Sequence, residues 1–402
     1  MPFAALELSA ALAAMAMGLL TWCRAPAKPL WYLAIAAGEW GHYLSVLCLA
    51  AFVFSLSRRG AAKSSVWLLA AILLLTPTLR AWRLSRWLPE ACASAFGRHA
   101  LMERPGAPGQ PYPFSFRRLF RGIPGVSVVK TTSTYPGADG TMLKMDLYRR
   151  ADTLQNEPIV VLIHGGSWRS GDHSELPALN RYLAARGYAV AAIEYRLAPK
   201  HPFPAARDDV RAAVRFLIGH ARLLGLDPSR IALIGRSAGG QIALSAAYDA
   251  PVAAIKGVAA FYSPNDLVLA YQLPSNPLVL NSREVLESYL GGPLATRPTL
   301  YEEASPLRLV TSKTVPTLLV HGEIDPLVWS LHSHRLDQKL TQAGVPHLFL
   351  DLPWATHGCD ANLSGPSGQL VLYALERFLA SVLKVTPDEQ WAQRIAGFDG
   401  RS

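Results

Sequence analysis

The chain has 402 residues, a formal net charge of +10 at pH 7 and a hydrophobic content of 50%, with a positive mean hydropathy of +0.18. This composition is rich in apolar residues for a soluble enzyme, and the excess lies in the first hundred residues. Those residues also supply +6 of the charge, from nine Lys or Arg minus three Glu. Because no basic stripe or recognition motif accompanies this charge, we expect no nucleic-acid partner.

Three apolar segments occupy this first part of the chain, at residues 6–22, 30–56 and 66–79. A helix needs about 20 apolar residues to cross a bilayer, so the middle segment is long enough and the third is short. Glu7 and the lack of a preceding basic stretch argue against a cleaved signal peptide. We therefore expect residues 1–100 to be a membrane region with two or three transmembrane helices, three being favoured.

Charged residues within and beside these segments give two further expectations. Glu39 and His42 lie inside the middle segment, where ionisable groups are costly and often functional; we favour the alternative that packed helices satisfy them. With three spans, the flanking basic residues number five on one side of the membrane and three on the other. The positive-inside rule then favours the cytoplasmic side for the rest of the chain, whereas two spans can invert this orientation.

A linker is expected at residues 101–125. The run 113–121 within it mixes aromatic residues with arginines. Such a run suits the headgroup boundary of a membrane, and a linker that packs between two domains is the alternative.

Strands alternate with helices along residues 126–385. The expected strands are residues 126–134, 142–148, 159–163, 189–194, 231–234, 257–261, 317–320 and 347–352. The expected helices are residues 175–186, 205–224, 239–248, 282–290 and 368–383. This alternation predicts an α/β fold with a mostly parallel sheet covered by helices on both faces. Residues 262–307 lose the regularity and are expected to form a small cap over the strand ends, and residues 386–402 a polar tail.

The most informative motif is the G-x-S-x-G of Gly235 to Gly239, which follows the apolar run 231–234 and precedes a helix. A sharp turn between strand and helix exposes the serine hydroxyl, and small residues on both sides let the two backbones approach. Ser237 is therefore the candidate nucleophile. For the motif taken alone, a glycine-rich turn without chemistry is the alternative interpretation.

A second glycine motif, H-G-G-S-W at residues 164–168, follows the expected strand 159–163. In this architecture the backbone N–H groups of such a loop, and of the residue after the nucleophile, bind a developing oxyanion. We expect the oxyanion donors to be Gly165, Gly166 and Ala238. Trp168 and Arg236, which belong to the two motifs, are expected to contact the substrate.

A serine nucleophile of this kind requires an acid and then a histidine, each after a later strand. Asp325 follows the strand 317–320 and is the expected acid, with Glu323 in the same loop as the fallback. His357 follows the strand 347–352 and is the expected base. The remaining pair, His332 and His334, falls in an expected helix where i and i+2 side chains point apart, so both are expected to be solvated.

No metal or nucleotide motif accompanies these residues, so we expect no cofactor. The four cysteines have no framework spacing and indicate no redox compartment: Cys23, Cys48, Cys92 and Cys359.

The part of the chain at about residues 135–383 also resembles a known family of proteins. The stretch 195–206, Y-R-L-A-P-K-H-P-F-P-A-A, resembles one in the hormone-sensitive-lipase-like esterases of the α/β-hydrolase superfamily. The stretch 164–172, H-G-G-S-W-R-S-G-D, resembles the related carboxylesterases, arylformamidases and isoprenylcysteine methylesterases. The resemblance implies the triad of Ser237, Asp325 and His357, the oxyanion donors named above, and short or medium acyl esters as substrates. Arg236 stands where lipase-like members usually carry an acidic residue.

Together these features predict a membrane-anchored serine hydrolase that cleaves carboxylic esters, lipid-derived ones included, through an acyl-enzyme intermediate. An amidase or peptidase of the same fold is the alternative among enzymes. A catalytically idle scaffold tethered to a membrane is the alternative outside enzymes. The expected partners are the ester substrate and the bilayer, and the oligomeric state is left open.

Overall fold

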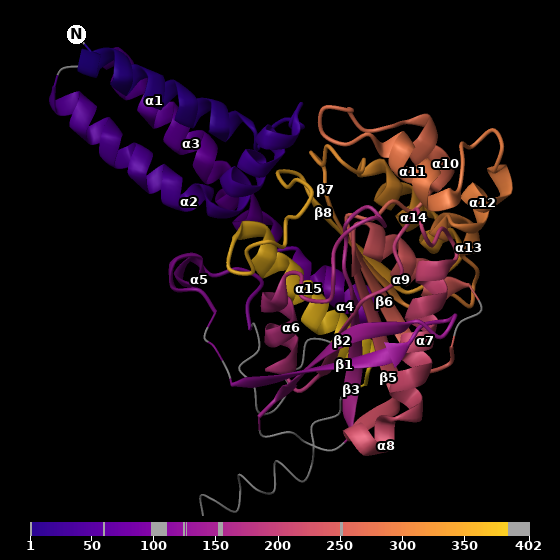
Figure 1. Ribbon diagram of the computed structural model, residues 1–402. Coiled ribbons are helices and arrows are strands. Elements are labelled where there is room, and N and C mark those ends of the chain that lie inside the picture. The colour runs from indigo at the N-terminus through magenta and orange to yellow at the C-terminus, as the bar shows by residue number, and fades with distance from the viewer. Residues whose placement is uncertain are drawn as a thin grey trace, which may run out of the picture.

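The computed structural model describes residues 2–58, 61–97, 111–123, 125, 127–151, 156–249 and 252–384. The expected polar tail at residues 386–402 and residues 101–110 of the expected linker lie outside these ranges. Within them, a sheet flanked by helices forms the larger part, and three long N-terminal helices extend from one side of it (Figure 1).

The sheet has eight strands in the order β1-β2-β4-β3-β5-β6-β7-β8. In chain order they are β1 (Val128–Pro136), β2 (Met142–Arg150), β3 (Glu157–Ile163), β4 (Ala189–Ile193), β5 (Leu226–Arg236), β6 (Ile255–Phe261), β7 (Thr317–Gly322) and β8 (His347–Leu352). β1 pairs antiparallel with β2, and β2 antiparallel with β4, whereas the pairs from β4 through β8 are parallel. The predicted fold class, a mostly parallel α/β sheet, is therefore confirmed.

Helices cover both faces of this sheet because its central strands are apolar on both sides. All seven residues of β3 are buried, as expected of a strand inside a parallel sheet. Ile159 and Val161 pack in one apolar cluster with α7 (Ala205–Gly219) and α9 (Ala238–Tyr248). Val160 packs in a second cluster, on the opposite face. The helices there are α6 (Pro177–Ala184) and α15 (Pro366–Val382).

The remaining helices follow the expected pattern with two differences. The helix expected at residues 205–224 ends at Gly219, and a short α8 (Ala221–Leu224) follows His220. Between β6 and β7 the irregular stretch carries four short helices, one of them at the residues expected to be helical. They are α10 (Leu267–Gln272), α11 (Ser282–Leu290), α12 (Pro298–Glu303) and α13 (Pro306–Leu309), and α14 (Leu331–Gln342) comes after β7. In Figure 1 the stretch between β6 and β7, which we call the insertion, lies at the right beyond the strand ends, whereas α14 packs against β7 and β8.

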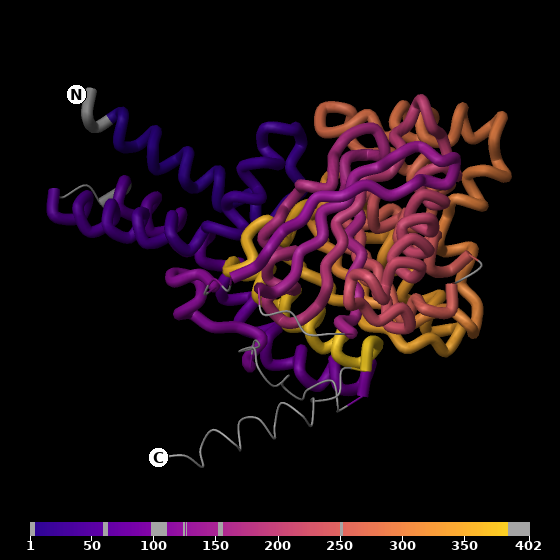
Figure 2. Tube along the Cα trace, turned by 60° about the horizontal axis from the view of Figure 1, so that its bottom comes forward, coloured from indigo at the N-terminus to yellow at the C-terminus, as the bar shows by residue number. Residues whose placement is uncertain are grey.

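The N-terminal bundle consists of α1 (Pro2–Leu19), α2 (Lys28–Ser57) and α3 (Ala61–Leu84). By length and composition α2 and the stretch Lys63–Leu84 of α3 can cross a membrane, whereas the apolar part of α1, Ala5–Leu19, is shorter. Figure 2 shows that the bundle extends away from the sheet and that the N-terminus lies at its far end.

The structure groups the residues before the boundary expected at residue 100 differently, because α4 (Leu88–Phe96) packs on the α/β part of the chain. Leu88 and Cys92 are fully buried in the same apolar cluster as residues of α15 and β8. The rings of Phe96 and Phe378 meet edge to face, with their centroids 5.3 Å apart. Residues 88–96 therefore belong with the α/β core, which we define as β1–β8 with the helices packed on them, α4 included. A short α5 (Phe116–Arg121) follows before β1.

Replacing Leu88 with alanine should destabilise this core. Removal of a fully buried leucine side chain costs about 2–5 kcal/mol, which corresponds to a fall in the unfolding midpoint of roughly 5–15 °C for a unit of this size. Thermal unfolding of the full chain in detergent measures it. Leu223→Ala is the matched control, since Leu223 is 83% exposed. Equal midpoints for the two variants would contradict the assignment of α4 to the core.

Candidate active site

Ser237 lies in the sharp turn between β5 and α9. Its φ of 53° and ψ of −123° are unusual for a residue with a side chain, and such strain is typical of functional turns. A Cβ on Gly235 would lie 2.1 Å from Gly239 O, and one on Gly239 would lie 2.2 Å from His164 O. Both positions therefore require glycine, and the turn presses directly against the loop after β3.

Three side chains from three strand ends meet at this turn. Ser237 Oγ lies 3.0 Å from His357 Nε2, and His357 Nδ1 lies 2.6 Å from Asp325 Oδ2. His357 and Asp325 are buried. The sequence-predicted nucleophile, acid and base are thus within hydrogen-bonding distance in the order that nucleophilic catalysis requires.

Asp325 is held as a carboxylate by its surroundings. Burial would raise its pKa, but His357 and His321 together hold the pKa well below its ordinary value. Asp325 Oδ1 also accepts the backbone N–H groups of Leu327, at 2.7 Å, and Val328, at 2.9 Å. His321, which the sequence reasoning did not single out, lies 3.3 Å from Asp325 Oδ2. His321 is the last residue but one of β7. In the sequence, only its position just before the loop that carries Asp325 could have indicated this contact.

The fallback acid, Glu323, takes no part in this chain of hydrogen bonds. Its carboxylate accepts from Ser330 Oγ at 2.9 Å and lies 2.5 Å from His334 Nε2. The ligand atoms of Glu323, His334 and Asp351 lie within 4.8 Å of one another. Since hydrogen bonds already join members of this cluster, and partly exposed acidic groups commonly gather without an ion, we assign no metal to it.

His332 is not solvated, contrary to the expectation from its helical spacing. It is 2% exposed, and its Nδ1 lies 3.3 Å from the backbone N of Asp266. Burial lowers the pKa of His332 to about 3, so the imidazole is neutral. The expectation failed because α14 turns this side chain toward the insertion, which the helical spacing alone does not reveal.

The expected oxyanion donors lie beside Ser237, where a Cβ on Gly165 would lie 3.4 Å from Ser237 Cβ and Gly166 lines the same cavity as Ser237. Gly166 has a φ of +104°, and a Cβ there would lie 2.1 Å from Ser170 O. In the part of the chain that the structure describes, the N–H groups of Gly166 and Ala238 have no hydrogen-bond partner. The same holds for Ser167, a donor that the sequence reasoning missed, which also has a positive φ of 55°. Gly165 differs, because its backbone hydrogen-bonds to Glu175.

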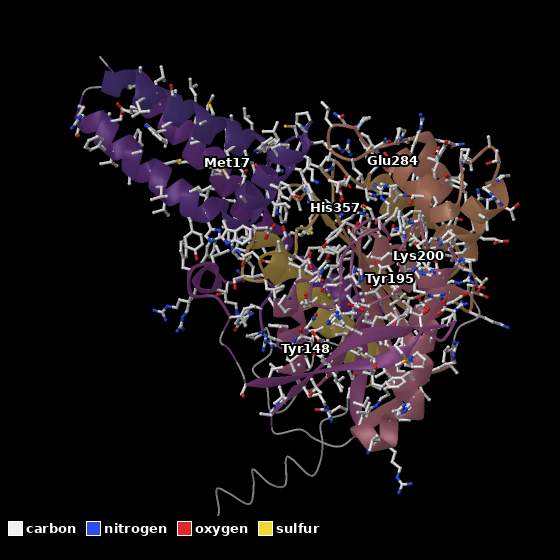
Figure 3. The ribbon with its side chains drawn as sticks, in the orientation of Figure 1. Met17, Tyr148, Tyr195, Lys200, Glu284 and His357 are labelled. Atoms are coloured by element: carbon white, nitrogen blue, oxygen red, sulfur yellow. The ribbon has the colours of Figure 1, made fainter. Side chains whose placement is uncertain are left out.

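The stretch after β4 supports the loop after β3, and Tyr195 makes the contact. Its hydroxyl donates to His164 O at 3.0 Å and to Gly165 O at 3.2 Å, and its ring stacks on the imidazole of His164 with centroids 4.3 Å apart. Burial lowers the pKa of His164, which keeps it uncharged. Figure 3 shows Tyr195 within the α/β core and His357 between the N-terminal helices and the insertion.

Two cavities meet at Ser237. The smaller has a volume of about 40 Å³ and is mostly apolar, with Trp168, Leu286 and Trp329 in its wall. The larger has a volume of about 400 Å³ and is more polar. Ser167, Leu280 and Leu327 also line both cavities.

Trp168 and Arg236 each border one of these cavities, and their expected contact with substrate stays a prediction. Trp168 stacks on Tyr289 at 4.4 Å between centroids and donates from Nε1 to Gln241. Arg236 lines the larger cavity and is 5% exposed. Its Nε donates to Asp360 Oδ2 at 2.5 Å, whereas its buried Nη2 has no partner in the described residues.

Tyr262 connects Arg236 to the histidine. The Tyr262 hydroxyl donates to Asp360 Oδ1 at 2.6 Å, and the Tyr262 ring lies 4.4 Å from the His357 imidazole, centroid to centroid. The basic residue before the nucleophile is therefore neutralised by an acid from the histidine loop, which also orders that loop.

Comparison with known proteins finds similarity to esterases. The BD-FAE family profile matches residues 145–340. The ethyl acetate hydrolase of Pseudomonas putida is 32% identical over 240 residues, which cover 54% of this chain and 72% of that protein. Esterase LipQ of Mycobacterium tuberculosis is 27% identical over 267 residues, covering 62% of each chain. Among solved structures, a bacterial heroin esterase superposes with a TM-score of 0.57 at 26% identity, covering 65% of this chain and 87% of that one.

The fold and these matches define an α/β hydrolase, and the chain belongs to the hormone-sensitive-lipase-like carboxylesterases of that superfamily. The alignments span only 62% of LipQ and 60% of a second M. tuberculosis relative, the probable carboxylic ester hydrolase LipM. The N-terminal bundle falls outside the matched residues 145–340 of the family profile.

Asp325→Asn should lower kcat for a small ester by on the order of 10⁴-fold, since an amide no longer selects the correct histidine tautomer or stabilises its charge. Steady-state hydrolysis of a nitrophenyl ester by the full chain measures it. Glu323→Gln is the control and should keep kcat within about twofold, because the Glu323 carboxylate contacts Ser330 and His334 and takes no part in the chain of hydrogen bonds from Asp325 to Ser237. A normal rate for Asp325→Asn would refute the assignment of the acid.

Proposed function

We propose that this protein hydrolyses carboxylic esters through an acyl-enzyme formed on Ser237. The observation that carries the proposal is the continuous chain of hydrogen bonds from Asp325 through His357 to Ser237. His357 takes the Ser237 proton as Oγ attacks the ester carbonyl, and then delivers that proton to the departing alcohol. Water activated by His357 next attacks the acyl-enzyme, releasing the carboxylic acid and restoring the serine.

The oxyanion that forms at each step is stabilised by backbone donors. We propose Gly166 and Ala238 for this role, as the sequence indicated, together with Ser167. Their N–H groups lack partners in the described part of the chain, which supports the assignment. Gly165, also predicted as a donor, keeps that assignment only if its backbone turns from Glu175 to the substrate. A preorganised donor of this kind contributes roughly 10²–10³-fold to the rate.

The smaller, more apolar cavity is proposed to hold the acyl group and the larger cavity the alcohol. At about 40 Å³ the acyl cavity has room for roughly three water-sized groups, which supports short acyl chains. The larger cavity has about ten times that volume, so bulky alcohols fit there. Trp168 would then contact the acyl chain and Arg236 the alcohol.

We further propose that the N-terminal bundle inserts into a membrane. Large apolar side chains are exposed along all three helices, where water would be an unfavourable neighbour. They include Leu6, Leu12, Val46, Leu47, Val53, Phe54, Leu69 and Ile72. The charge asymmetry across three spans supports an orientation with the α/β core on the cytoplasmic side, since Arg24, Lys28 and Arg80 lie at the end of the bundle nearest the core.

The depth of insertion is set by where the bundle meets the core. Gly18 of α1, Gly41 of α2 and Leu74 of α3 lie at the same height along the bundle axis, because Leu73 and Leu74 occupy the space beside the two glycines. About fifteen residues of each helix extend beyond that level, or roughly 22 Å at 1.5 Å per residue, against a hydrocarbon core of about 30 Å. Because this length is shorter than the hydrocarbon core, the bundle can span it only with the α/β core drawn against the membrane surface, where exposed Phe116 and Phe120 of α5 are suited to insert.

One experiment separates this function from its alternatives. Washed membranes containing the wild type or Ser237→Ala are assayed on nitrophenyl esters of increasing acyl length and on a nitroanilide of the same acyl group. We expect carbonate-resistant activity on short-chain esters, reduced by on the order of 10³-fold or more in Ser237→Ala. Faster cleavage of the anilide than of the ester would indicate an amidase. A folded wild type without activity on either substrate would indicate an idle scaffold. Activity released into the carbonate wash would contradict the proposal that the bundle anchors the protein in the membrane.

Leu286→Ala should shift acyl preference toward longer chains. Leu286 is 2% exposed and lines the smaller cavity, so its truncation makes room for additional methylene groups. We expect the ratio of kcat/KM for octanoate over acetate esters to rise about tenfold. Leu278→Ala is the control, because Leu278 belongs to the same insertion but is 72% exposed. An unchanged ratio in Leu286→Ala would place the acyl chain elsewhere.

A further inference from the structure

Helix α2 lies along the chain segment that carries His357. Trp31, Ile35 and Glu39 are spaced four residues apart and so share one face of the helix. Trp31 Nε1 donates to the His357 backbone oxygen at 2.9 Å. Ile35 packs on the next residue, Gly358, where an added Cβ would lie 3.4 Å from Ile35 Cδ1.

Glu39 continues this contact one turn further along. Its carbonyl oxygen accepts from Asn362 Nδ2 at 3.0 Å, and its carboxylate accepts the backbone N–H of Ser367 at 3.3 Å. Glu39 is 2% exposed. The loop between β8 and α15 is therefore bonded to successive turns of one helix, from His357 to the start of α15.

The turn before α2 is bonded to the loops around the site as well. Arg24 Nη2 donates to Glu323 O at 3.1 Å, and its guanidinium lies 4.2 Å from the Trp329 ring centroid. The backbone N–H of Lys28 donates to Leu278 O, and Asn276 Nδ2 donates to Pro26 O. Residues 24–28 thus contact both the acid-bearing loop and the insertion.

Trp31 also borders the reacting groups themselves. Its ring lies edge-on to the His357 imidazole with centroids 6.1 Å apart, on a histidine that also contacts Tyr262. Together with Lys28 and Tyr32, Trp31 lines the cavity of about 400 Å³ that reaches Ser237 and His357. The first turn of α2 therefore forms part of the wall of the site.

We propose that Trp31 is a positioning residue for His357, and that the N-terminal bundle is consequently a component of the active site as well as an anchor. The inference rests on the proposed esterase function. Asp325 holds His357 Nδ1 by a hydrogen bond, and Trp31 holds the backbone carbonyl of His357. A displacement of this backbone by a fraction of an ångström lengthens the 3.0 Å contact between His357 and Ser237, to which proton transfer is sensitive.

Trp31→Phe tests this inference in the full chain held in detergent micelles. The variant keeps an aromatic ring and removes the donor to His357 O. For a short nitrophenyl ester we expect kcat to fall about tenfold, with KM within about twofold of wild type. Trp40→Phe is the matched control, since Trp40 lies on the same helix but is 38% exposed and should leave kcat unchanged.

The rate at which a fluorophosphonate labels Ser237 gives a second readout that needs no turnover. We expect this rate to fall in Trp31→Phe by the same factor as kcat, while the thermal midpoint stays that of Trp40→Phe. Wild-type kcat and labelling in Trp31→Phe would overturn the inference and leave the esterase function standing. Failure of the wild type both to hydrolyse esters and to be labelled would overturn the two together.

A double-mutant cycle distinguishes positioning of His357 from a general structural effect. In a His357→Ala background the bond to His357 no longer has a catalytic side chain to orient, so Trp31→Phe should change the residual rate by less than about twofold. If Trp31→Phe again lowers the rate about tenfold, Trp31 acts through something other than His357 and the inference is wrong.

Discussion

The site depends on one close approach between backbones, where the turn after β5 passes against the end of β3. At Gly239 a single added carbon would lie 2.2 Å from His164 O, so nothing separates the nucleophile turn from the oxyanion loop. The two groups proposed to act on the same carbonyl, Ser237 and the N–H of Gly166, are therefore placed by rigid main chain. Sites built on such elements hold their geometry more precisely than sites carried by mobile loops.

The histidine half of the site is held differently. His357 comes from a loop between β8 and α15, outside the sheet, and side chains hold it: Asp325 at the imidazole, Tyr262 against the ring, Trp31 at the carbonyl oxygen. Arg236 and Asp360 tie Tyr262 and this loop to the residue before the nucleophile. One half of the site is thus fixed by the sheet, and the other by a shell of buried polar contacts that includes the N-terminal bundle.

The sequence was informative wherever function is encoded in short motifs at strand ends. Hydrophobic runs located the strands to within two residues, apart from the early start of β5 at Leu226, and the bounds of β8 were predicted correctly. The order of Ser237, Asp325 and His357 followed from the fold class. Neither α4 in the core nor α2 on the histidine loop was predicted, because an apolar helix has the same composition whether lipid or protein covers it. Trp31 and His357 are 326 positions apart, and no local pattern relates them.

Glu39 bears on the order in which the chain can assemble. Its carboxylate is satisfied by the N–H of Ser367, 328 positions later. At a synthesis rate of about 5–20 residues per second, α2 exists for on the order of half a minute before that partner has been made. During this interval a lipid-buried Glu39 would be a charge, or an unpaired acid, in hydrocarbon. With the bundle inserted as proposed, this cost favours an order in which the proximal turns of α2 stay outside the hydrocarbon until α15 has been synthesised, and docking of the bundle is completed afterwards.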